Sequence, residues 1–511
     1  MPLWQGPDEP AHFAYVQYME GHGVPPRQII VAPGRAAWQF SPSPAELASI
    51  DLTQRNQILT NPQRGLSITA HERARVLEQI AAASHNRYAN QPGSQNYVAI
   101  YPPLYYQTIA LAIRGFDIVN VTTQAYLARM ITALWLGMAG VLWDIVLAFI
   151  VFSRPLRLAM LSFFVLMFPT FQMLGGVIGN DMPADAASLA IFALALWAIA
   201  KPKTLVTPKS AIVFGVVTGL AILTKEEAYI ALVVSLPFVI WSVWSEHLSS
   251  ARKWLWLGTV AVSASILAGP WLALTFYRYH ALVPPLTYQG LGSSPHSLAW
   301  VLGSEFLSGS FELNLLVTQT VFGVDFPWWV PWHASLWRYR GLAMIWIVLL
   351  VGGFYVSRKQ KGWGLSLAWI VVGVMFLWGV QWQYDMTTGA PFLQGRYFFF
   401  LLAPVGWIGG QLMIRLPHWG RTVLFVLAFV LSGLVINHTL WRYYHASIGE
   451  FVLGRIVMFA PHGILLISRI GVLTSVGIMA TIMVQNVFSK SNKQELDRES
   501  ANTLSNSNGE H

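Results

Sequence analysis

The sequence predicts an all-α, polytopic helical membrane protein, and three observations support this class. Hydrophobic residues make up 55% of the 511 residues and charged residues only 11%, with a mean hydropathy of +0.49. Apolar runs close to the length that crosses a bilayer recur along the chain. The 23 tryptophans suit a protein with many membrane interfaces. The absence of cysteine excludes disulfides, thiolate metal sites and cysteine nucleophiles.

The apolar runs predict about eleven membrane spans on the rule of roughly twenty residues each. They lie at 127–152, 157–178, 183–200, 211–223, 228–245, 254–276, 341–356, 364–381, 397–413, 421–440 and 462–487. The net charge of +9 is concentrated in short gaps between the runs, so it indicates orientation and not a nucleic-acid partner. Basic gaps are expected to be cytoplasmic, which places the N-terminal segment outside and the tail inside. These gaps are Ser153–Arg157, Lys201–Lys209, Glu246–Lys253, Ser357–Gly362, Arg415–Arg421 and the tail after Ser489.

Five regions follow from this pattern. They are a first extracytoplasmic loop with interfacial helices (1–126), an N-terminal transmembrane bundle (127–276), a long extracytoplasmic segment (277–340), C-terminal transmembrane helices (341–488) and a disordered cytoplasmic tail (489–511). The first region contains a short apolar stretch that is typical of a helix lying on the outer leaflet. It begins with Tyr101-Pro102-Pro103-Leu104-Tyr105-Tyr106. In the long segment, the aromatic residues of 321–329 favour a surface partly embedded in lipid headgroups.

A polar cluster near the start of the chain is the first site candidate. Asp8 and Glu9 stand between Pro7 and Pro10, and His12 follows two residues later, ahead of the membrane-spanning part. Ionisable groups at the edge of a bilayer protein indicate a site, because lipid gives them no partner. The alternative is that the two acids cap the helix that begins at Pro10.

Three later segments add charged groups to the same predicted outer surface. Asn180 and Asp181 occupy an outer turn, where Asp181 could instead cap the next span. Lys225 is the one lysine outside the basic gaps, and it either pairs with Glu226 or Glu227 or faces an anionic ligand.

The last segment is Gln394-Gly395-Arg396-Tyr397, which stands at the mouth of a late span. Arg396 is well suited to a phosphate or pyrophosphate, because its guanidinium is planar and permanently charged. The alternative is an arginine that snorkels to a lipid phosphate.

Taken in order, these motifs resemble the GT-C membrane glycosyltransferases. The chain is more narrowly similar to the prokaryotic branch related to protein O-mannosyltransferases and lipid A aminoarabinose transferase, including a family with this Pro-Asp-Glu-Pro-Ala-His pattern. Each motif is weak alone, but their order and shared side of the membrane carry the resemblance over most of the chain. It implies a multi-pass plasma-membrane enzyme of the cell envelope, with its site on the extracytoplasmic side.

The implied reaction moves a hexosyl or pentosyl group from a polyprenyl-phosphate donor to a glycan, lipid or protein acceptor, with inversion at the anomeric carbon. The resemblance makes Asp8 the group that activates the acceptor and Asp181 the second acid, which positions substrate or joins Asp8 around a divalent cation. Lys225 and Arg396 would hold the leaving phosphate. The remaining substrate-binding candidates are Glu9, His12, Asn180, Glu226, Gln394 and Tyr397.

One departure from the family pattern concerns the start of the chain. Family members begin with a transmembrane helix that delivers the acidic loop outside, whereas Met1 lies seven residues before Asp8. The expectation is therefore a truncated chain or a misassigned start.

Two other functions stay open from the sequence. A transporter or flippase of lipid-linked or envelope saccharides would require charged residues or broken helices near the middle of the membrane, where Asp144 is the main candidate. That residue also suits a contact with the Arg154–Arg157 gap. A non-catalytic assembly protein for envelope polymers is the third possibility.

Overall fold

The computed structural model describes residues 2–27, 42–60, 65–66, 68–86, 96–152, 154–284, 336–388, 394–461 and 463–474, with residues 297, 299 and 477. Every regular element within these ranges is a helix, which confirms the predicted all-α class. Most of the segment 277–340 with its aromatic stretch 321–329, the end of the last apolar run and the tail 489–511 lie outside the described residues.

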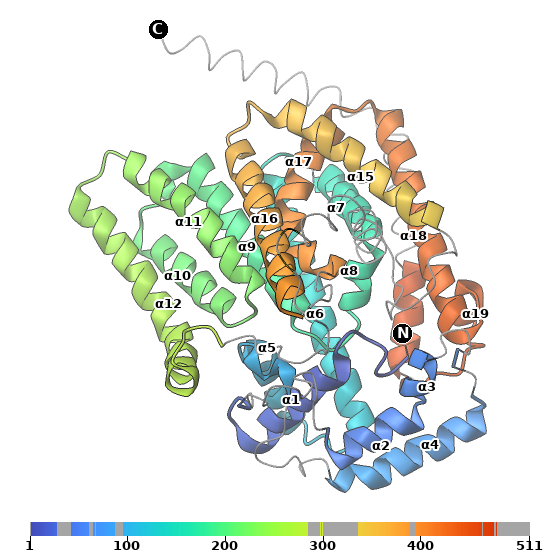
Figure 1. Cartoon of the computed structure of the whole chain (residues 1–511). Coiled ribbons are helices and arrows are strands. Elements are labelled where there is room, and N and C mark those ends of the chain that lie inside the picture. Colours follow the sequence, from blue (N-terminus) through green and yellow to red (C-terminus); the bar gives the residue numbers. More distant parts are fainter. Residues whose placement is uncertain are drawn as a thin grey trace.

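The N-terminal helices are α1 (Glu9–His22), α2 (Pro44–Leu52), α3 (Arg55–Thr60), α4 (Ala70–Ala83), η2 (Ser84–Asn86), η3 (Tyr97–Ile100) and α5 (Leu104–Gly115). They gather at one end of the molecule, below the long helices in Figure 1. We call this group the cap.

The long helices and their connections are α6 (Val121–Ala148), α7 (Arg154–Met167), α8 (Pro169–Leu174), α9 (Asp181–Ala200), η4 (Pro202–Thr204), α10 (Pro208–Ile222), α11 (Glu227–Ser245), α12 (Ser250–Tyr279), α15 (Leu336–Ser357), α16 (Trp363–Thr388), η6 (Gly395–Leu401), α17 (Leu402–Arg415), α18 (His418–Tyr444) and α19 (Ile448–Val452).

Eight helices of the described chain are long and apolar enough to cross a membrane, so the protein is a multi-pass membrane protein. The other three predicted runs, 157–178, 211–223 and 462–487, contain shorter apolar helices. The first of them is divided into α7 and α8 because Pro169 begins a new helix and cannot continue the old one. The count of about eleven spans thus corresponds to eight full-length helices and three short ones.

Among the long helices, α9 and the segment that ends in α17 are the most buried, and α9 packs against both α6 and α11 (Figure 1). On the outside of this group, α10 packs along α12 with small residues at the contact. A Cβ at Gly215 would lie 2.6 Å from the Val260 carbonyl oxygen, so only glycine permits this approach. Close backbone packing of this kind is common between membrane helices.

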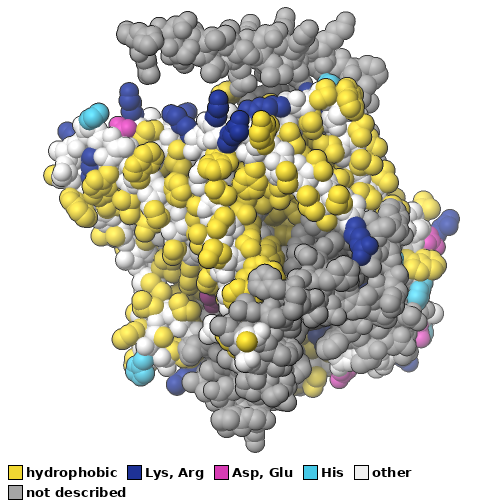
Figure 2. Space-filling model, turned by 45° about the horizontal axis from the view of Figure 1, so that its top comes forward, with side chains coloured by type: hydrophobic (Ala, Val, Ile, Leu, Met, Phe, Trp, Pro, Cys, Tyr) yellow, Lys and Arg dark blue, Asp and Glu magenta, His cyan; other side chains and the backbone are white. Residues whose placement is uncertain are grey.

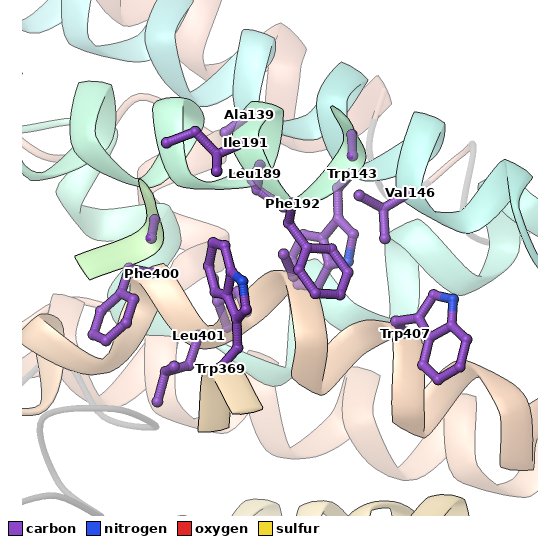
Figure 3. Close-up of a cluster of buried hydrophobic side chains, with 14 of the residues drawn as sticks. Ala139, Trp143, Val146, Leu189, Ile191, Phe192, Trp369, Phe400, Leu401 and Trp407 are labelled. Atoms are coloured by element: carbon purple, nitrogen blue, oxygen red, sulfur yellow. The ribbon is translucent and has the colours of Figure 1, made fainter. Parts of the chain in front are cut away.

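Aromatic side chains fill the core between α6, α9, α16 and α17. The close-up in Figure 3 shows Trp143, Phe192 and Trp369 from three different helices beside one another. Phe192 meets the edge of Trp369 with the ring centroids 5.2 Å apart. All three side chains are fully buried, and offset or edge contacts of this type stabilise beyond the area they bury.

The basic connections lie at the end of the bundle away from the cap. Lys and Arg side chains line one rim of the molecule, next to an apolar band (Figure 2). Near that rim, Arg157 Nε lies 3.1 Å from Asp144 Oδ1, which confirms the predicted contact of Asp144 with the basic gap. The charge pattern therefore separates the two ends of the helices, as the orientation rule requires of a membrane protein.

The cap has its own hydrophobic core, formed where α1 packs on α5 and η3. In α5, Tyr105, Tyr106 and Ile109 are buried, whereas Leu111 and the C-cap residue Phe116 are 55% and 73% exposed. This half-exposed apolar face has the amphipathic form that the sequence predicted for an interfacial helix, although its place in a membrane stays a prediction.

Replacement of Gly406 tests the packing of α17 on α6. A Cβ there would collide with the Trp143 indole, whose Cε2 would lie 2.9 Å away. We expect Gly406→Ala to destabilise the protein by about 1–3 kcal/mol, the typical result of overpacking a filled core. Thermal unfolding followed by tryptophan fluorescence in detergent measures this. Gly140→Ala is the control, since a Cβ at Gly140 meets nothing within 4 Å; equal midpoints for the two variants would contradict the packing.

Candidate active site at the capped end of the bundle

Asp8 occupies the N-cap position of α1 in an unusual conformation. Its backbone is left-handed, with φ 55° and ψ 10°, and its side chain does not cap the helix. The carboxylate instead accepts hydrogen bonds from the Tyr97 hydroxyl at 2.8 Å and from Arg396 Nη2 at 2.5 Å. A non-glycine residue in this region is strained, and such strain is concentrated at functional sites. The side chain stays 35% exposed, so a ligand can reach it.

Asp181, Lys225 and Arg396 meet Asp8 at the same place. Lys225 Nζ lies 2.7 Å from Asp181 Oδ1 and 2.8 Å from Glu227 Oε1. The Arg396 guanidinium, whose Nη2 holds Asp8, also places Nη1 3.8 Å from Asp181 Oδ2. We call Asp8, Asp181, Lys225, Glu227 and Arg396 the charged cluster. It joins the first turn of α1, the start of α9, the α10–α11 connection and the start of η6.

Tyrosine rings frame the two bases of the charged cluster. Lys225 Nζ lies 5.4 Å from the centre of the Tyr101 ring and 4.9 Å from that of Tyr397, and the Arg396 guanidinium carbon lies 5.3 Å from the Tyr397 ring. Cations within about 6 Å of an aromatic face are stabilised by its electron density. The rings therefore hold Lys225 and Arg396 in place without neutralising them.

The electrostatics keep Asp8 and Lys225 charged at neutral pH. Burial alone would raise the pKa of Asp8, but the Arg396 guanidinium and hydrogen bonds from Arg396 and Tyr97 lower the pKa below its usual 3.8. Burial would likewise lower the pKa of Lys225, but Asp181 and Glu227 raise it well above the usual 10.5. A carboxylate and an ammonium group thus coexist in a largely buried site.

His12 lies beside the charged cluster as a neutral ring. Its ring lies nearly parallel to those of Tyr101 and Tyr106, with centroids 6.0 and 5.9 Å away, and its Nδ1 lies 2.7 Å from the Tyr106 hydroxyl. Burial lowers the pKa of His12 to about 4, in spite of the nearby carboxylates of Asp8 and Asp181. His12 is therefore uncharged at neutral pH.

Glu9 has a different position from its neighbour Asp8. Its carboxylate is fully buried and pairs with Arg129 of α6, with Arg129 Nε and Nη2 each 2.7 Å from one of its oxygens. The same oxygens accept hydrogen bonds from the backbone N–H groups of Ile178 at 3.1 Å and Gly6 at 3.2 Å. Glu9 thus fixes the loop that carries Asp8 to the turn that precedes Asp181, and the structure does not bring it into the charged cluster.

The other predicted binding residues surround the charged cluster with fewer contacts. Asn180 is fully buried, with its Nδ2 3.5 Å from the Thr224 carbonyl oxygen. Gln394 is the N-cap of η6 and is 7% exposed. Tyr397 packs on both bases as described. Glu226 caps α11 without a side-chain hydrogen bond to it, and Lys225 pairs with Glu227 instead, which settles the choice between them that the sequence left open.

The positions of Asp8 and Asp181 show whether the two carboxylates could hold a divalent cation between them. A guanidinium, not a gap, lies between Asp8 and Asp181. The described residues contain no group of three His, Cys, Asp or Glu side chains that could hold a metal ion. The described residues of this region therefore do not fit a resident cation.

The sequence analysis did not identify three residues of this region, Tyr97, Arg129 and Asp185, and it named Glu227 only as a possible partner of Lys225. Arg129 and Asp185 lie within apolar runs, and an ionisable residue inside a span is itself a signal that could have found both. Nothing in the sequence around Tyr97 distinguishes it from the other tyrosines of the cap.

Comparisons with known proteins give one family and two similar structures. The family model described as "Predicted membrane protein (DUF2142)" matches residues 1–405. A search among curated proteins found no match. The solved structures with similarity include ArnT from Cupriavidus metallidurans in the apo state, with 13% identity, a TM-score of 0.43 and coverage of 92% of this chain and 73% of that chain. The same protein bound to undecaprenyl phosphate gives 14% identity, a TM-score of 0.41 and coverage of 93% and 74%.

Removal of Arg129 tests the buried pair. Arg129→Ala leaves the Glu9 carboxylate buried without a cation, so we expect it to destabilise the protein by about 3–5 kcal/mol. Combining it with Glu9→Gln removes the uncompensated charge and should restore part of this loss. Unfolding in detergent measures both, with Arg75→Ala on the exposed face of α4 as the control. A loss no larger than that of Arg75→Ala would show that the pair does not hold the loop.

The buried His12 predicts a pH effect on stability. The unfolded chain takes up a proton as pH falls through the usual pKa of 6.5, whereas the folded protein resists it until about pH 4. The free energy of unfolding therefore falls between pH 6.5 and pH 4, by about 3 kcal/mol at most. His12→Gln should lose this part of the pH dependence, whereas His22→Gln, at the exposed end of α1, should keep it. Parallel profiles for wild type and His12→Gln would refute the assignment.

Proposed function

The chain belongs to the DUF2142 family, and we propose that it is an integral-membrane glycosyltransferase that moves a sugar from a polyprenyl-phosphate donor to an acceptor at the outer membrane face. The proposal rests on the charged cluster and on the resemblance of its motifs to GT-C glycosyltransferases. The donor sugar would be a hexose or a pentose, and the acceptor a glycan, a lipid or a protein.

One observation carries the proposal: two buried cations lie together with a free N–H donor. The side chains of Lys225 and Arg396 are each 5% exposed, and Arg396 Nε is buried with no hydrogen-bond partner in the described part of the chain. A buried donor without a partner is costly, and native proteins rarely keep one without a reason. A phosphate oxygen supplies the missing acceptor, and arginine and lysine are the side chains suited to phosphate.

The proposed reaction uses the acids and bases of the charged cluster in separate roles. The Asp8 carboxylate accepts the proton of the acceptor hydroxyl or amine as that group attacks the anomeric carbon. The bond between the anomeric carbon and the phosphate oxygen breaks, and its electron pair leaves with polyprenyl phosphate. Lys225 and Arg396 stabilise the charge that develops on the phosphate. Asp181 holds both bases and is a second acid beside the oxocarbenium-like centre.

The donor phosphate would compete with Asp8 for Arg396. In the structure Arg396 Nη2 holds Asp8, which keeps the carboxylate a weak base. Movement of Arg396 toward the phosphate would weaken that pair and raise the basicity of Asp8 when the donor is in place. Tyr97 would keep the carboxylate in position through its hydroxyl.

The location of the site supports the outer face of the plasma membrane. The charged cluster lies at the capped ends of the helices, and the basic connections lie at their other ends (Figures 1 and 2). Because positive charge favours the cytoplasmic side, the cap would be extracytoplasmic. Asp144, the residue that favoured a transporter, pairs with Arg157 near the basic rim, so it gives no support to that alternative.

Replacement of Asp8 tests the proposed base. We expect Asp8→Asn to lower sugar transfer by about 10²–10⁴-fold, because amide nitrogen cannot take the acceptor's proton. Binding of polyprenyl phosphate should stay the same or become tighter, since the competitor for Arg396 is gone. The assay is release of polyprenyl phosphate from lipid-linked mannose, glucose or arabinose in membranes that contain the protein.

The matched control for this experiment is Asp51→Asn, an exposed carboxylate on α2 of the same cap. It should keep wild-type transfer. Full activity of Asp8→Asn would overturn the role of Asp8, and no release from any of the three donors by wild type would overturn the function.

A further inference from the structure

A second group of side chains beside the charged cluster has unsatisfied hydrogen-bond acceptors. Asp185, one turn beyond Asp181 in α9, is 5% exposed, and its Oδ2 is buried without a partner in the described part of the chain. The same holds for Asn180 Oδ1 and for Glu227 Oε2. We call Asn180, Asp185 and Glu227 the acceptor group. Buried acceptors are nearly always satisfied in native proteins, so three together indicate an unseen partner.

The acceptor group lies at one joint between α9 and α11. Residues four apart on a helix share a face, which places Asp185 beneath Asp181. Asp181 and Glu227 both bind Lys225 Nζ, at 2.7 and 2.8 Å, so the carboxylates at the starts of the two helices share one ammonium group. The charged groups that act on Asp185 are Asp181, Glu227 and Lys225. Asn180 closes the set, because its amide reaches the residue before Lys225.

The free atoms of the two groups are opposite in kind. The unpartnered atoms of the acceptor group are oxygens of two carboxyl groups and one amide, whereas the unpartnered atom of the bases is the Nε–H donor of Arg396. A phosphodiester anion has no donor, so it cannot satisfy the first group, whereas the two cations attract it. Sugar hydroxyl groups donate hydrogen bonds, so they satisfy the first. The two bases therefore suit a phosphate, and the acceptor group suits the hydroxyl groups of a sugar.

We propose that Asn180, Asp185 and Glu227 form a subsite that binds hydroxyl groups of the donor's sugar, with the phosphate on Lys225 and Arg396. This inference rests on the proposed function and deepens it, because it sets the orientation of the glycosyl phosphate. Asp185 is the specificity-determining residue of the subsite. The sugar points along α9 into the bundle, and the phosphate stays near η6, where its anomeric bond faces Asp8.

Binding of lipid with and without a sugar tests the subsite. Wild type should bind polyprenyl phosphate that carries mannose, glucose or arabinose more tightly than bare polyprenyl phosphate, for at least one of the sugars. Asp185→Asn should lose about tenfold or more of the affinity for that glycolipid. The subsite accepts hydrogen bonds from sugar hydroxyl groups, and the substitution replaces one accepting oxygen by an amide NH2 group, which is itself a donor. Its affinity for bare polyprenyl phosphate should stay within about twofold of wild type, since the phosphate contacts are unchanged.

The control is Asp144→Asn, the carboxylate of α6 that pairs with Arg157 near the basic rim. It should leave both affinities unchanged. Equal affinities of wild type for lipid with and without sugar would overturn the subsite, as would an Asp185→Asn variant that keeps both affinities or loses both equally. Preferential binding of a glycolipid without release of polyprenyl phosphate would leave the subsite intact and overturn the proposed function instead.

A measurement on wild-type protein covers the case in which Asp185→Asn does not fold. A hydrophobic carbodiimide labels buried carboxyl groups, and mass spectrometry locates the label. The glycolipid should protect Asp185 from labelling, and bare polyprenyl phosphate should not. Equal labelling of Asp185 with either lipid would overturn the proposal.

Discussion

The bridge made by Arg396 between Asp8 and Asp181 is the interaction on which the candidate site depends. Charges that leave water need partners, because their attraction is strong in a medium of low dielectric and their desolvation is costly. The charges of four segments are paired with one another in this way: the first turn of α1, the start of α9, the α10–α11 connection and the start of η6. No single segment could keep its charge at this depth alone, so the pairing also holds four helix ends together.

The adjacent carboxylates of Asp8 and Glu9 illustrate how the chain separates structure from chemistry. Glu9 is fully buried on Arg129 and on backbone N–H groups, so it is immobile. Asp8 stays partly exposed in a left-handed conformation that turns its side chain away from its own helix. The immobile acid holds the loop, and the exposed one is left for a ligand. The strain at Asp8 is sustained because the Glu9 pair determines the backbone next to it.

The fold class and most of the candidate residues could be predicted from the sequence, and the detail of their contacts could not. The long apolar runs each contain a helix, and Asp144 meets the basic gap as predicted. Asp8, Asp181, Lys225 and Arg396, chosen from separate segments, come together. The partner of Lys225 in its own segment was undecided, because two adjacent glutamates at a helix start point in different directions that residue order does not reveal. Arg129 and Asp185 were overlooked because they lie inside apolar runs.

The sequence by itself determined that the chain is a helical membrane protein, how its basic connections alternate, and which polar segments stand between its spans. These properties follow from hydrophobicity and charge along the chain, which decide what enters a bilayer and which way it faces. Only the tertiary structure decided which carboxylate meets which base and which acceptors stay unpaired. The physical reason is that helices such as α9 are apolar on nearly every side, so their pattern does not specify which face turns toward the site, and packing against α6 and α11 makes that choice.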